Sequence, residues 1–394
     1  MSLNATPSGE RIHISFFGCT NAGKSSLVNA FTGQKLSIVS DIQGTTTDPV
    51  EKAMELLPLG AVKIIDTAGF DDISELGQQR IKKTKQVLNK TDIAILVVDC
   101  TKNLTKTDLQ LVDLFKEKQI PYIIVYNKAD LLENIPESTQ NTIYTSTLTG
   151  LNIDNLKNLT ANLRNVKKER PLVSDIVKKG DFVVLVVPID SSAPKGRLIL
   201  PQQQVIRDLL DNGAVAIVSQ VNELKSVLNT IPKPKLVITD SQAFGEVAKI
   251  VDKDINLTSF SIIMARYKGD LPTQINGASA LNKLNENDKI LIAEGCTHHR
   301  QCEDIGTVKL PRWIREYTNK DFKFSFCSGT EFPEDLSEYK LIIHCGGCML
   351  NDKEIKSRLQ KAKEQNIPIT NYGTMIAYIN GILKRTIKPF NIDM

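Results

Sequence analysis

The sequence predicts an α/β fold in three domains, with a mostly parallel sheet in the first. The chain has 394 residues, which is too long for one ordinary hydrophobic core. Short apolar runs alternate with polar, helix-compatible segments along most of it, a pattern typical of parallel strands covered by helices. Residues 165–181 are charged, contain Pro171 and lack periodicity, so we expect a linker there.

Five strand-like runs place the first domain at residues 1–170. Each is followed by helix-compatible sequence, as a sheet with helices on both faces requires. The runs are "RIHISFFG" (11–18), "VKIIDTAG" (62–69), "IAILVVDC" (93–100), "PYIIVYNKAD" (121–130) and "NTIYTSTLTG" (141–150).

Two further α/β domains are expected at residues 171–264 and 265–394. The second domain contains neither histidine nor cysteine, which favours a self-association role or a plain connecting role. The strand-like runs are 182–190, 214–220 and 235–240 in the second domain, and 288–296, 322–329, 339–348 and 367–373 in the third.

The composition excludes several classes of protein. Apolar residues make up 41% of the chain and charged residues 24%, as in soluble globular proteins. The net charge of +4 is small for this length, so neither nucleic acid nor an anionic membrane is expected as a partner. No run approaches the roughly 18 apolar residues of a membrane span, and the N-terminus lacks the pattern of an export signal. We therefore expect a cytoplasmic protein.

A phosphate-binding loop is predicted directly after the first strand. "GCTNAGKS" (18–25) fits G-x-x-x-x-G-K-[ST] between a strand and a helix, which is the context that this pattern requires. Backbone N–H groups of such a loop surround the phosphates at the helix N-terminus. Lys24 is expected to reach the β- and γ-phosphates, and Ser25 to ligate Mg²⁺. The residues expected to contact the nucleotide here are Gly18, Asn21, Ala22, Gly23, Lys24, Ser25 and Ser26.

Three further motifs at strand ends indicate a GTPase. In "DTAG" (66–69), Asp66 can hold Mg²⁺ through water and Gly69 can meet the γ-phosphate. In "NKAD" (127–130), the carboxylate can accept two hydrogen bonds that guanine offers and adenine does not. The residues expected around the base are Asn127, Lys128, Asp130, Ser146 and Thr147.

Residues 10–165 resemble the Era and MnmE branch of the translation-factor-related GTPases. "SDIQGTTTDP" (40–49) resembles the first switch of that branch, which implies Thr46 as a Mg²⁺ ligand. Asn21 matches the asparagine that ligates K⁺ in potassium-activated members, and Thr45 lies in the loop that completes that site, so K⁺ stimulation is expected. Phe70 replaces the water-orienting glutamine of Ras-like enzymes, which predicts slow hydrolysis. The catalytic residues expected are Lys24, Ser25, Thr46, Asp66 and Gly69.

Cysteine and histidine gather in the last hundred residues, where five of the seven cysteines and three of the four histidines lie. Cys296 ends one strand-like run, and "HCGGC" (344–348) ends another. Because ligands collect at the carboxyl ends of parallel strands, we expect Cys296 to meet Cys345 and Cys348. The two glycines between the latter let the backbone turn tightly and expose N–H groups to the sulfurs.

Three thiolates suit either zinc or an iron–sulfur cluster. Structural zinc needs four good ligands, whereas the fourth ligand is undecided here. This favours a [4Fe–4S] cluster with one exchangeable position over zinc or a plain thiol-rich core. His344 can equally be a hydrogen-bond donor beside a thiolate. The candidates for the fourth ligand are His298, His344 and Glu303, with Cys302, Asp304 and Cys327 nearby.

The pattern of Cys296 and His298 followed by His344, Cys345 and Cys348 resembles the signature of the HydF family, the GTPases required for maturation of [FeFe]-hydrogenases. The resemblance spans essentially the whole chain and implies a GTPase domain, a dimerisation domain and an iron–sulfur cluster-binding domain, in that order. It implies a homodimeric scaffold or carrier that holds a transient two-iron subcluster precursor. The partners that it implies are the radical-SAM maturases HydE and HydG and apo [FeFe]-hydrogenase.

Two other functions stay open at this point. An RNA-modification or ribosome-assembly GTPase with a structural zinc domain would also carry Era-like motifs, although no basic aromatic surface motif is present. A redox sensor in which the C-x-x-C pair cycles between thiols and a disulfide would not require the neighbouring histidine.

Overall fold

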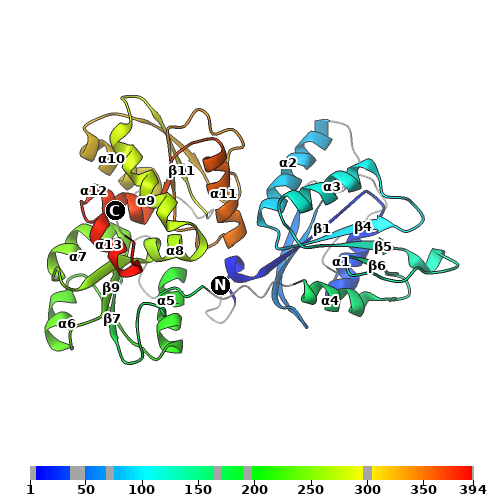
Figure 1. Ribbon diagram of the computed structural model, residues 1–394, viewed down its shortest axis with the longest axis horizontal. Coiled ribbons are helices and arrows are strands. Elements are labelled where there is room, and N and C mark those ends of the chain that lie inside the picture. Colours follow the sequence, from blue (N-terminus) through cyan, green and yellow to red (C-terminus); the bar gives the residue numbers. More distant parts are fainter. Residues whose placement is uncertain are drawn as a thin grey trace. The chain divides into compact units, whose positions relative to one another are not determined.

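The computed structural model describes residues 6–35, 49–67, 75–163, 170–189, 198–295 and 304–392, with the backbone alone for 75–82. The chain divides into two compact units, residues 1–167 and 168–394 (Figure 1). Unit 2 therefore contains both the second and the third predicted domains. The division between residues 264 and 265 stays a prediction.

Unit 1 is built on a six-stranded sheet in the order β2-β3-β1-β4-β5-β6, and only β2 is antiparallel to its neighbour. The strands are β1 (Ile12–Gly18), β2 (Val50–Leu56), β3 (Gly60–Asp66), β4 (Ile93–Asp99), β5 (Tyr122–Asn127) and β6 (Thr142–Tyr144). The helices are α1 (Lys24–Thr32), α2 (Glu75–Lys90), α3 (Lys106–Glu117) and α4 (Ile153–Asn162).

Helices cover both faces of this sheet because successive strand residues point to opposite sides. Phe16 packs with Phe31 of α1 and Leu156 of α4 on one face. Phe17 packs with α2 and with Phe115 of α3 on the other. The predicted parallel α/β architecture is confirmed. The sequence missed β2, an edge strand whose side chains are mostly exposed and so lack an apolar run.

Unit 2 holds two parallel four-stranded sheets, in the orders β10-β9-β7-β8 and β12-β11-β13-β14. The strands are β7 (Phe182–Val186), β8 (Val215–Ser219), β9 (Leu236–Thr239), β10 (Asn256–Ser259), β11 (Lys289–Ala293), β12 (Lys323–Cys327), β13 (Leu341–His344) and β14 (Ile369–Asn371). The helices are α5 (Leu200–Asp211), α6 (Leu224–Thr230), α7 (Phe244–Ile250), α8 (Phe260–Lys268), α9 (Leu271–Ser279), α10 (Leu310–Thr318), α11 (Asp352–Glu364), α12 (Tyr372–Ile379) and α13 (Leu383–Ile387).

One hydrophobic core joins the two sheets of unit 2. It contains Val184 and Val237 from the first sheet, Ile292 and Ile343 from the second, and Ile262 from α8. Because these side chains are all buried in a single cluster, the two sheets cannot separate without exposing apolar surface.

The linker predicted at 165–181 is wrong for residues 170–181. This stretch contains neither helix nor strand, but Asp208 accepts hydrogen bonds from the backbone N–H groups of Val173 and Ser174, each at 2.8 Å. Because charged residues separate its few apolar side chains, the sequence showed no apolar run that would predict their burial. Those buried in the core are Leu172, Val173 and Val177.

None of the helices in the described ranges is both long enough and apolar enough to cross a lipid bilayer.

Candidate functional sites

The phosphate-binding loop leaves β1 in the middle of the sheet, where the strand order switches between β3 and β4. Gly18 has a φ of 147°, and a Cβ there would lie 2.3 Å from the carbonyl oxygen of Val97. Gly23 has a φ of 84°, and a Cβ there would lie 2.3 Å from Asn127 Nδ2. Glycine is therefore needed at both positions, because the loop packs directly on the ends of β4 and β5.

Lys24, Ser25 and Asp66 meet beneath this loop. Ser25 Oγ donates a hydrogen bond to Asp66 Oδ2 at 3.1 Å, and Lys24 Nζ lies 3.4 Å from Asp66 Oδ1. Asp66 is buried, and its Oδ1 forms no hydrogen bond within the described part of the chain. A buried carboxylate oxygen without a hydrogen bond, next to a serine hydroxyl, fits the oxygen ligands that Mg²⁺ prefers.

The predicted base-binding residues come together at the ends of β5 and β6. Asn127 is buried, and its Nδ2 donates to the carbonyl of Ala22 at 3.3 Å, which joins the phosphate loop to the base loop. Ser146 Oγ donates to the carboxylate of Asp130, whose side chain is otherwise exposed. Thr147 follows, half-buried. Sequence reasoning missed Thr145, whose hydroxyl donates to Asn127 Oδ1 at 3.4 Å.

Lys128 takes up a position that the sequence does not reveal. Its backbone has a φ of 64°, and its Nζ donates to Asp99 Oδ2 at 2.6 Å. Burial alone would raise the pKa of Asp99, but the hydrogen bonds from Lys128 and Thr101 lower it to about 2. The ion pair thereby ties Lys128 to the last residue of β4.

Several predicted residues of the nucleotide site lie outside the described residues, namely Thr45, Thr46 and Gly69. Asn21 and Ser26 are described: Asn21 is exposed in the loop with a φ of 65°, and Ser26 is half-buried on α1. The described part therefore contains the phosphate and base loops, while the first switch remains a prediction.

The cysteine loop lies at the carboxyl end of β13 in unit 2. β13 is the parallel neighbour of β11, with Ala293 opposite His344, so the two strand ends are adjacent, as the sequence predicts. Cys345 Sγ accepts hydrogen bonds from the N–H groups of Gly295 at 2.9 Å and Gly347 at 3.3 Å. Gly295 is the residue before Cys296, which itself lies outside the described residues.

Both cysteines of this loop are half-buried, and their surroundings govern their acidity. Burial, together with the neighbouring Cys348, raises the pKa of the Cys345 thiol to about 12. Burial also raises the pKa of Cys348, partly offset by the positive charge of Lys268. The metal-free protein therefore holds these groups as thiols, and a metal would have to displace their protons.

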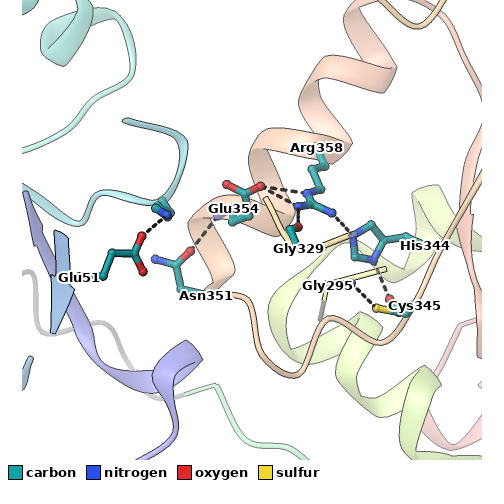
Figure 2. A network of polar contacts seen from close by, with 9 residues as sticks. Glu51, Gly295, Gly329, His344, Cys345, Asn351, Glu354 and Arg358 are labelled. Carbon is teal, nitrogen blue, oxygen red and sulfur yellow. Dashed lines mark hydrogen bonds and ion pairs between the residues drawn. The ribbon is translucent and has the colours of Figure 1, made fainter. Parts of the chain in front are cut away.

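His344 is fully engaged by its neighbours (Figure 2). Its Nε2 lies 2.9 Å from Arg358 Nη1, and its Nδ1 lies 2.7 Å from the carbonyl oxygen of Cys345. A guanidinium only donates hydrogen bonds, so Nε2 must accept from Arg358. The ring proton therefore lies on Nδ1, which donates to the carbonyl oxygen of Cys345. Burial and the charge of Arg358 lower the pKa of His344 to about 3, which keeps the imidazole neutral.

A buried ion pair on α11 orients Arg358. Its guanidinium lies 2.9 Å from Glu354 Oε1 and donates to the carbonyl of Gly329 at 2.5 Å. The carboxylate and guanidinium are one helical turn apart, and both are almost completely buried. Asn351 caps α11 by accepting from the N–H of Glu354 at 3.0 Å (Figure 2). The sequence analysis did not predict this pair. Its only local signal in the sequence is the spacing of two opposite charges four residues apart.

A cavity of about 10 Å³, roughly the space of one water molecule, lies beside the loop. His344, Cys345 and Arg358 line it together with Asn371. Cys327 ends strand β12, the neighbour of β11, and burial raises the pKa of its thiol to about 11. Within the described ranges, no three His, Cys, Asp or Glu side chains are grouped closely enough to hold a metal. The remaining candidate ligands, Cys296, His298 and Glu303, lie outside those ranges.

Family models divide the chain into three matched segments. Residues 13–128 match the model of a 50S ribosome-binding GTPase. Residues 172–269 match the hydrogen maturase F dimerization domain, and residues 272–389 match the hydrogen maturase F tetramerization domain. The two hydrogen maturase F models together cover more than half of the chain.

Similar curated proteins include tRNA modification GTPases, which match less than half of this chain. The tRNA modification GTPase MnmE of a Thermoanaerobacter species is 35% identical over 39% of this chain and 35% of its own length. MnmE of Helicobacter pylori is 43% identical over 30% of this chain and 26% of its own length. The chain thus spans about a third or less of these relatives.

Among solved structures, that of Era with a GTP analogue and a piece of 16S ribosomal RNA matches at 20% identity and a TM-score of 0.35. That match covers 53% of this chain and 92% of the Era chain.

The GTPase motifs of unit 1 occur on the same chain as the matches to both hydrogen maturase F models. These two matches together span the described strands and helices of unit 2 from β7 to α13. The chain therefore belongs to the hydrogen maturase F (HydF) family.

Proposed function

We propose that this protein binds and hydrolyses GTP and serves as a scaffold or carrier in [FeFe]-hydrogenase maturation. In this proposal it binds a [4Fe–4S] cluster with an exchangeable fourth ligand. It assembles or delivers the two-iron subcluster precursor to apo [FeFe]-hydrogenase. One observation carries the proposal: a GTPase site and a loop with two half-buried cysteines occur on one chain with both hydrogen maturase F domains.

The roles at the nucleotide site follow from its contacts. Lys24 offers its ammonium to the phosphates, while Ser25 and Asp66 offer oxygens to Mg²⁺. Asp130 accepts from the guanine ring, held in place by Ser146. Thr46 and Gly69 are proposed to complete the site when the switches close.

Potassium stimulation is a separate part of the proposal. Asn21 projects from the phosphate loop into solvent, where its side-chain oxygen is available to a cation next to the phosphates. Thr45 is proposed to add a second ligand. Faster GTP hydrolysis in K⁺ than in Na⁺ at equal ionic strength would support this site, and equal rates would exclude it.

Cys296, Cys345 and Cys348 are proposed to hold the cluster through three thiolates. Bound in this way, the cluster would supply one iron whose remaining position can exchange ligands. N–H groups already directed at Cys345 Sγ stabilise the thiolate form of that residue.

Of the three candidate fourth ligands, His298 and Glu303 are retained in the proposal. His344 is assigned a positioning role, because Arg358 and Cys345 engage both of its ring nitrogens.

The proposed partners are a second copy of this chain, the radical-SAM maturases HydE and HydG, and apo [FeFe]-hydrogenase, in the cytoplasm. The dimerization and tetramerization family models support self-association. The alternative, an RNA-modification or ribosome-assembly GTPase with structural zinc, gains no support from residues 172–389, because these match the hydrogen maturase F models.

Anaerobic reconstitution of the full-length protein with iron and sulfide tests the proposal. The expected result is visible absorption typical of an iron–sulfur cluster and, after reduction, an EPR signal that changes when a small exogenous ligand is added. Stoichiometric zinc in anaerobically prepared protein, with no uptake of iron, would overturn the cluster and favour the zinc alternative.

A further inference from the structure

Helix α8 contacts the cysteine loop. It follows β10 of the first sheet of unit 2, but its contacts reach the second sheet. The carbonyl of Ser261 accepts from Asn371 Nδ2 at 2.8 Å, and its hydroxyl accepts from the N–H of Gly373 at 3.1 Å. Met264 and Ala265 line the cavity beside Cys345. A helix within the dimerization match thus touches the loop that carries the cysteines.

The last residue of this helix, Lys268, is the most unusual part of the contact. Its side chain is only 2% exposed, which is rare for lysine. Its Nζ donates to the carbonyl oxygens of Cys348 at 3.1 Å and Leu350 at 2.7 Å. Burying an ammonium is costly unless it is hydrogen-bonded, and the two backbone carbonyls of the cysteine loop supply hydrogen bonds to Lys268.

The hydrogen bond from Lys268 to the Cys348 carbonyl also orients the peptide group that follows Cys348. In a trans peptide the C=O of one residue and the N–H of the next point in opposite directions. Since Lys268 holds the Cys348 carbonyl, the N–H of Met349 is turned the other way, and this N–H partly offsets the rise in the pKa of Cys348 that burial causes. Leu350 then closes the turn through its N–H, which donates to the carbonyl of Gly347 at 3.0 Å.

We propose that Lys268 is a positioning residue of the cluster site, whose buried ammonium both fixes the backbone of the cysteine loop and compensates the negative charge of the thiolates. Thiolate ligands give such a site a net negative charge, and reduction adds another electron. A fixed positive charge nearby favours the reduced form, so Lys268 raises the reduction potential of the bound cluster.

This inference rests on the proposed function, and its test separates the two. The variants are Lys268→Met, which keeps the length and removes the charge, and Lys268→Arg, which keeps the charge. Lys363→Met on α11 is the matched control, because Lys363 is exposed. Full-length proteins are reconstituted with iron and sulfide, and the iron retained against a chelator, the midpoint potential and the EPR spectrum are measured. Circular dichroism confirms folding.

Lys268→Met is expected to bind the cluster about 10-fold more weakly or worse and to shift the midpoint potential to more negative values. Compared with Lys268→Met, Lys268→Arg should bring the midpoint potential closer to that of the unmodified protein than it brings the affinity for the cluster. Lys363→Met should match the unmodified protein in both. A folded Lys268→Met protein with unchanged potential and retention would overturn the inference. Equal losses in the Met and Arg variants would also overturn it, because packing alone would then explain them. Failure of the unmodified protein to take up iron would instead refute the proposed function.

Discussion

The nucleotide site of unit 1 and the cysteine loop of unit 2 occupy the same topological place, the carboxyl ends of parallel strands, but they solve opposite electrostatic problems. The nucleotide site must receive a polyanion, and it offers the ammonium of Lys24, whose side chain is 10% exposed. In the proposed function the cysteine loop receives metal cations, and it offers two half-buried thiols whose protons would have to leave.

The surroundings of the two loops differ accordingly. Around the nucleotide site, charged side chains pair at the carboxyl ends of the strands, as Lys128 does with Asp99, the last residue of β4. Around the cysteine loop, the cations Arg358 and Lys268 are almost completely buried and hold the backbone or His344. A site for a charged ligand can therefore be assembled largely from a local motif. A site that must stabilise its own thiolates depends on buried charges from other elements.

The largest effect is expected when the thiols are removed. Cys345→Ser and Cys348→Ser should abolish the iron uptake of unit 2, because two thiolates cannot hold a cluster that needs three. GTP hydrolysis should be unchanged, because the nucleotide contacts lie in unit 1. Iron content after reconstitution and phosphate release, measured on the same preparation, check both halves of the prediction.

Cys327→Ser is the matched control for those variants. Cys327 ends β12, which lies on the other side of β11 from β13, and it packs against the hydrophobic core. Iron uptake should persist in this variant. If Cys327→Ser lost iron and Cys345→Ser kept it, the assignment of the cysteine loop would be wrong.

Replacing Lys24 tests the other side of the comparison. Lys24→Ala should lower the rate of GTP hydrolysis by about 10²–10³-fold, since one preorganised charge at the phosphates is lost. Iron uptake should be normal. Lys116→Ala, at a side chain that is 61% exposed on α3, is the control and should hydrolyse GTP at the usual rate. Equal rates in the two variants would remove Lys24 from the site.

Breaking the buried pair on α11 should destabilise unit 2 by about 3–5 kcal/mol, because Arg358→Met leaves the Glu354 carboxylate buried without its partner. Trp313, the only tryptophan, lies on α10 of unit 2, so its fluorescence during urea unfolding reports on this unit. The double variant Glu354→Gln with Arg358→Met should recover much of the loss.

An exposed pair with the same spacing provides the control. Arg312 and Glu316 lie four residues apart on α10, and both side chains are at least 60% exposed. Arg312→Met should change the free energy of unfolding by about 1 kcal/mol or less. A comparable loss in both single variants would show that burial does not govern the α11 pair.

The two regions also differ in how much of them the sequence could predict. The phosphate loop and the C-x-x-C pair are contiguous motifs, and the runs before them are buried strands, so both were placed correctly on strand ends. The adjacency of the segment before Cys296 and the cysteine loop followed from the parallel order of strands, and the pairing of Ala293 with His344 bears it out.

What the sequence could not predict comes from contacts between distant elements. Lys268 lies 80 positions before Cys348, and Arg358 lies 14 positions after His344, so no spacing rule connects them. The edge strand β2 escaped prediction because its side chains are mostly exposed. The segment 170–181 looked like a linker because its few buried apolar side chains are separated by charges, and only the fold shows that they pack together.

The smallest expected effect concerns the acid stability of unit 1. Burial alone would raise the pKa of Glu51, but the ammonium groups of Lys90 and Lys63 lower it to about 2. A carboxylate whose pKa is lowered by folding stabilises the folded state above its unfolded pKa of about 4.5, and this stabilisation is lost as the pH falls from there to about 2. Glu51→Gln should therefore cost about 1 kcal/mol or less at neutral pH and remove this part of the acid transition.

Following the two units separately makes this small effect measurable. Binding of a fluorescent guanine nucleotide reports on unit 1, and Trp313 fluorescence reports on unit 2. In Glu51→Gln, the loss of nucleotide binding between pH 4.5 and about 2 should become less steep, while the Trp313 transition stays where it is. A shift of the Trp313 transition alone would contradict the assignment of this effect to unit 1. Unchanged transitions in both signals would show that the Glu51 pairs do not contribute to acid stability.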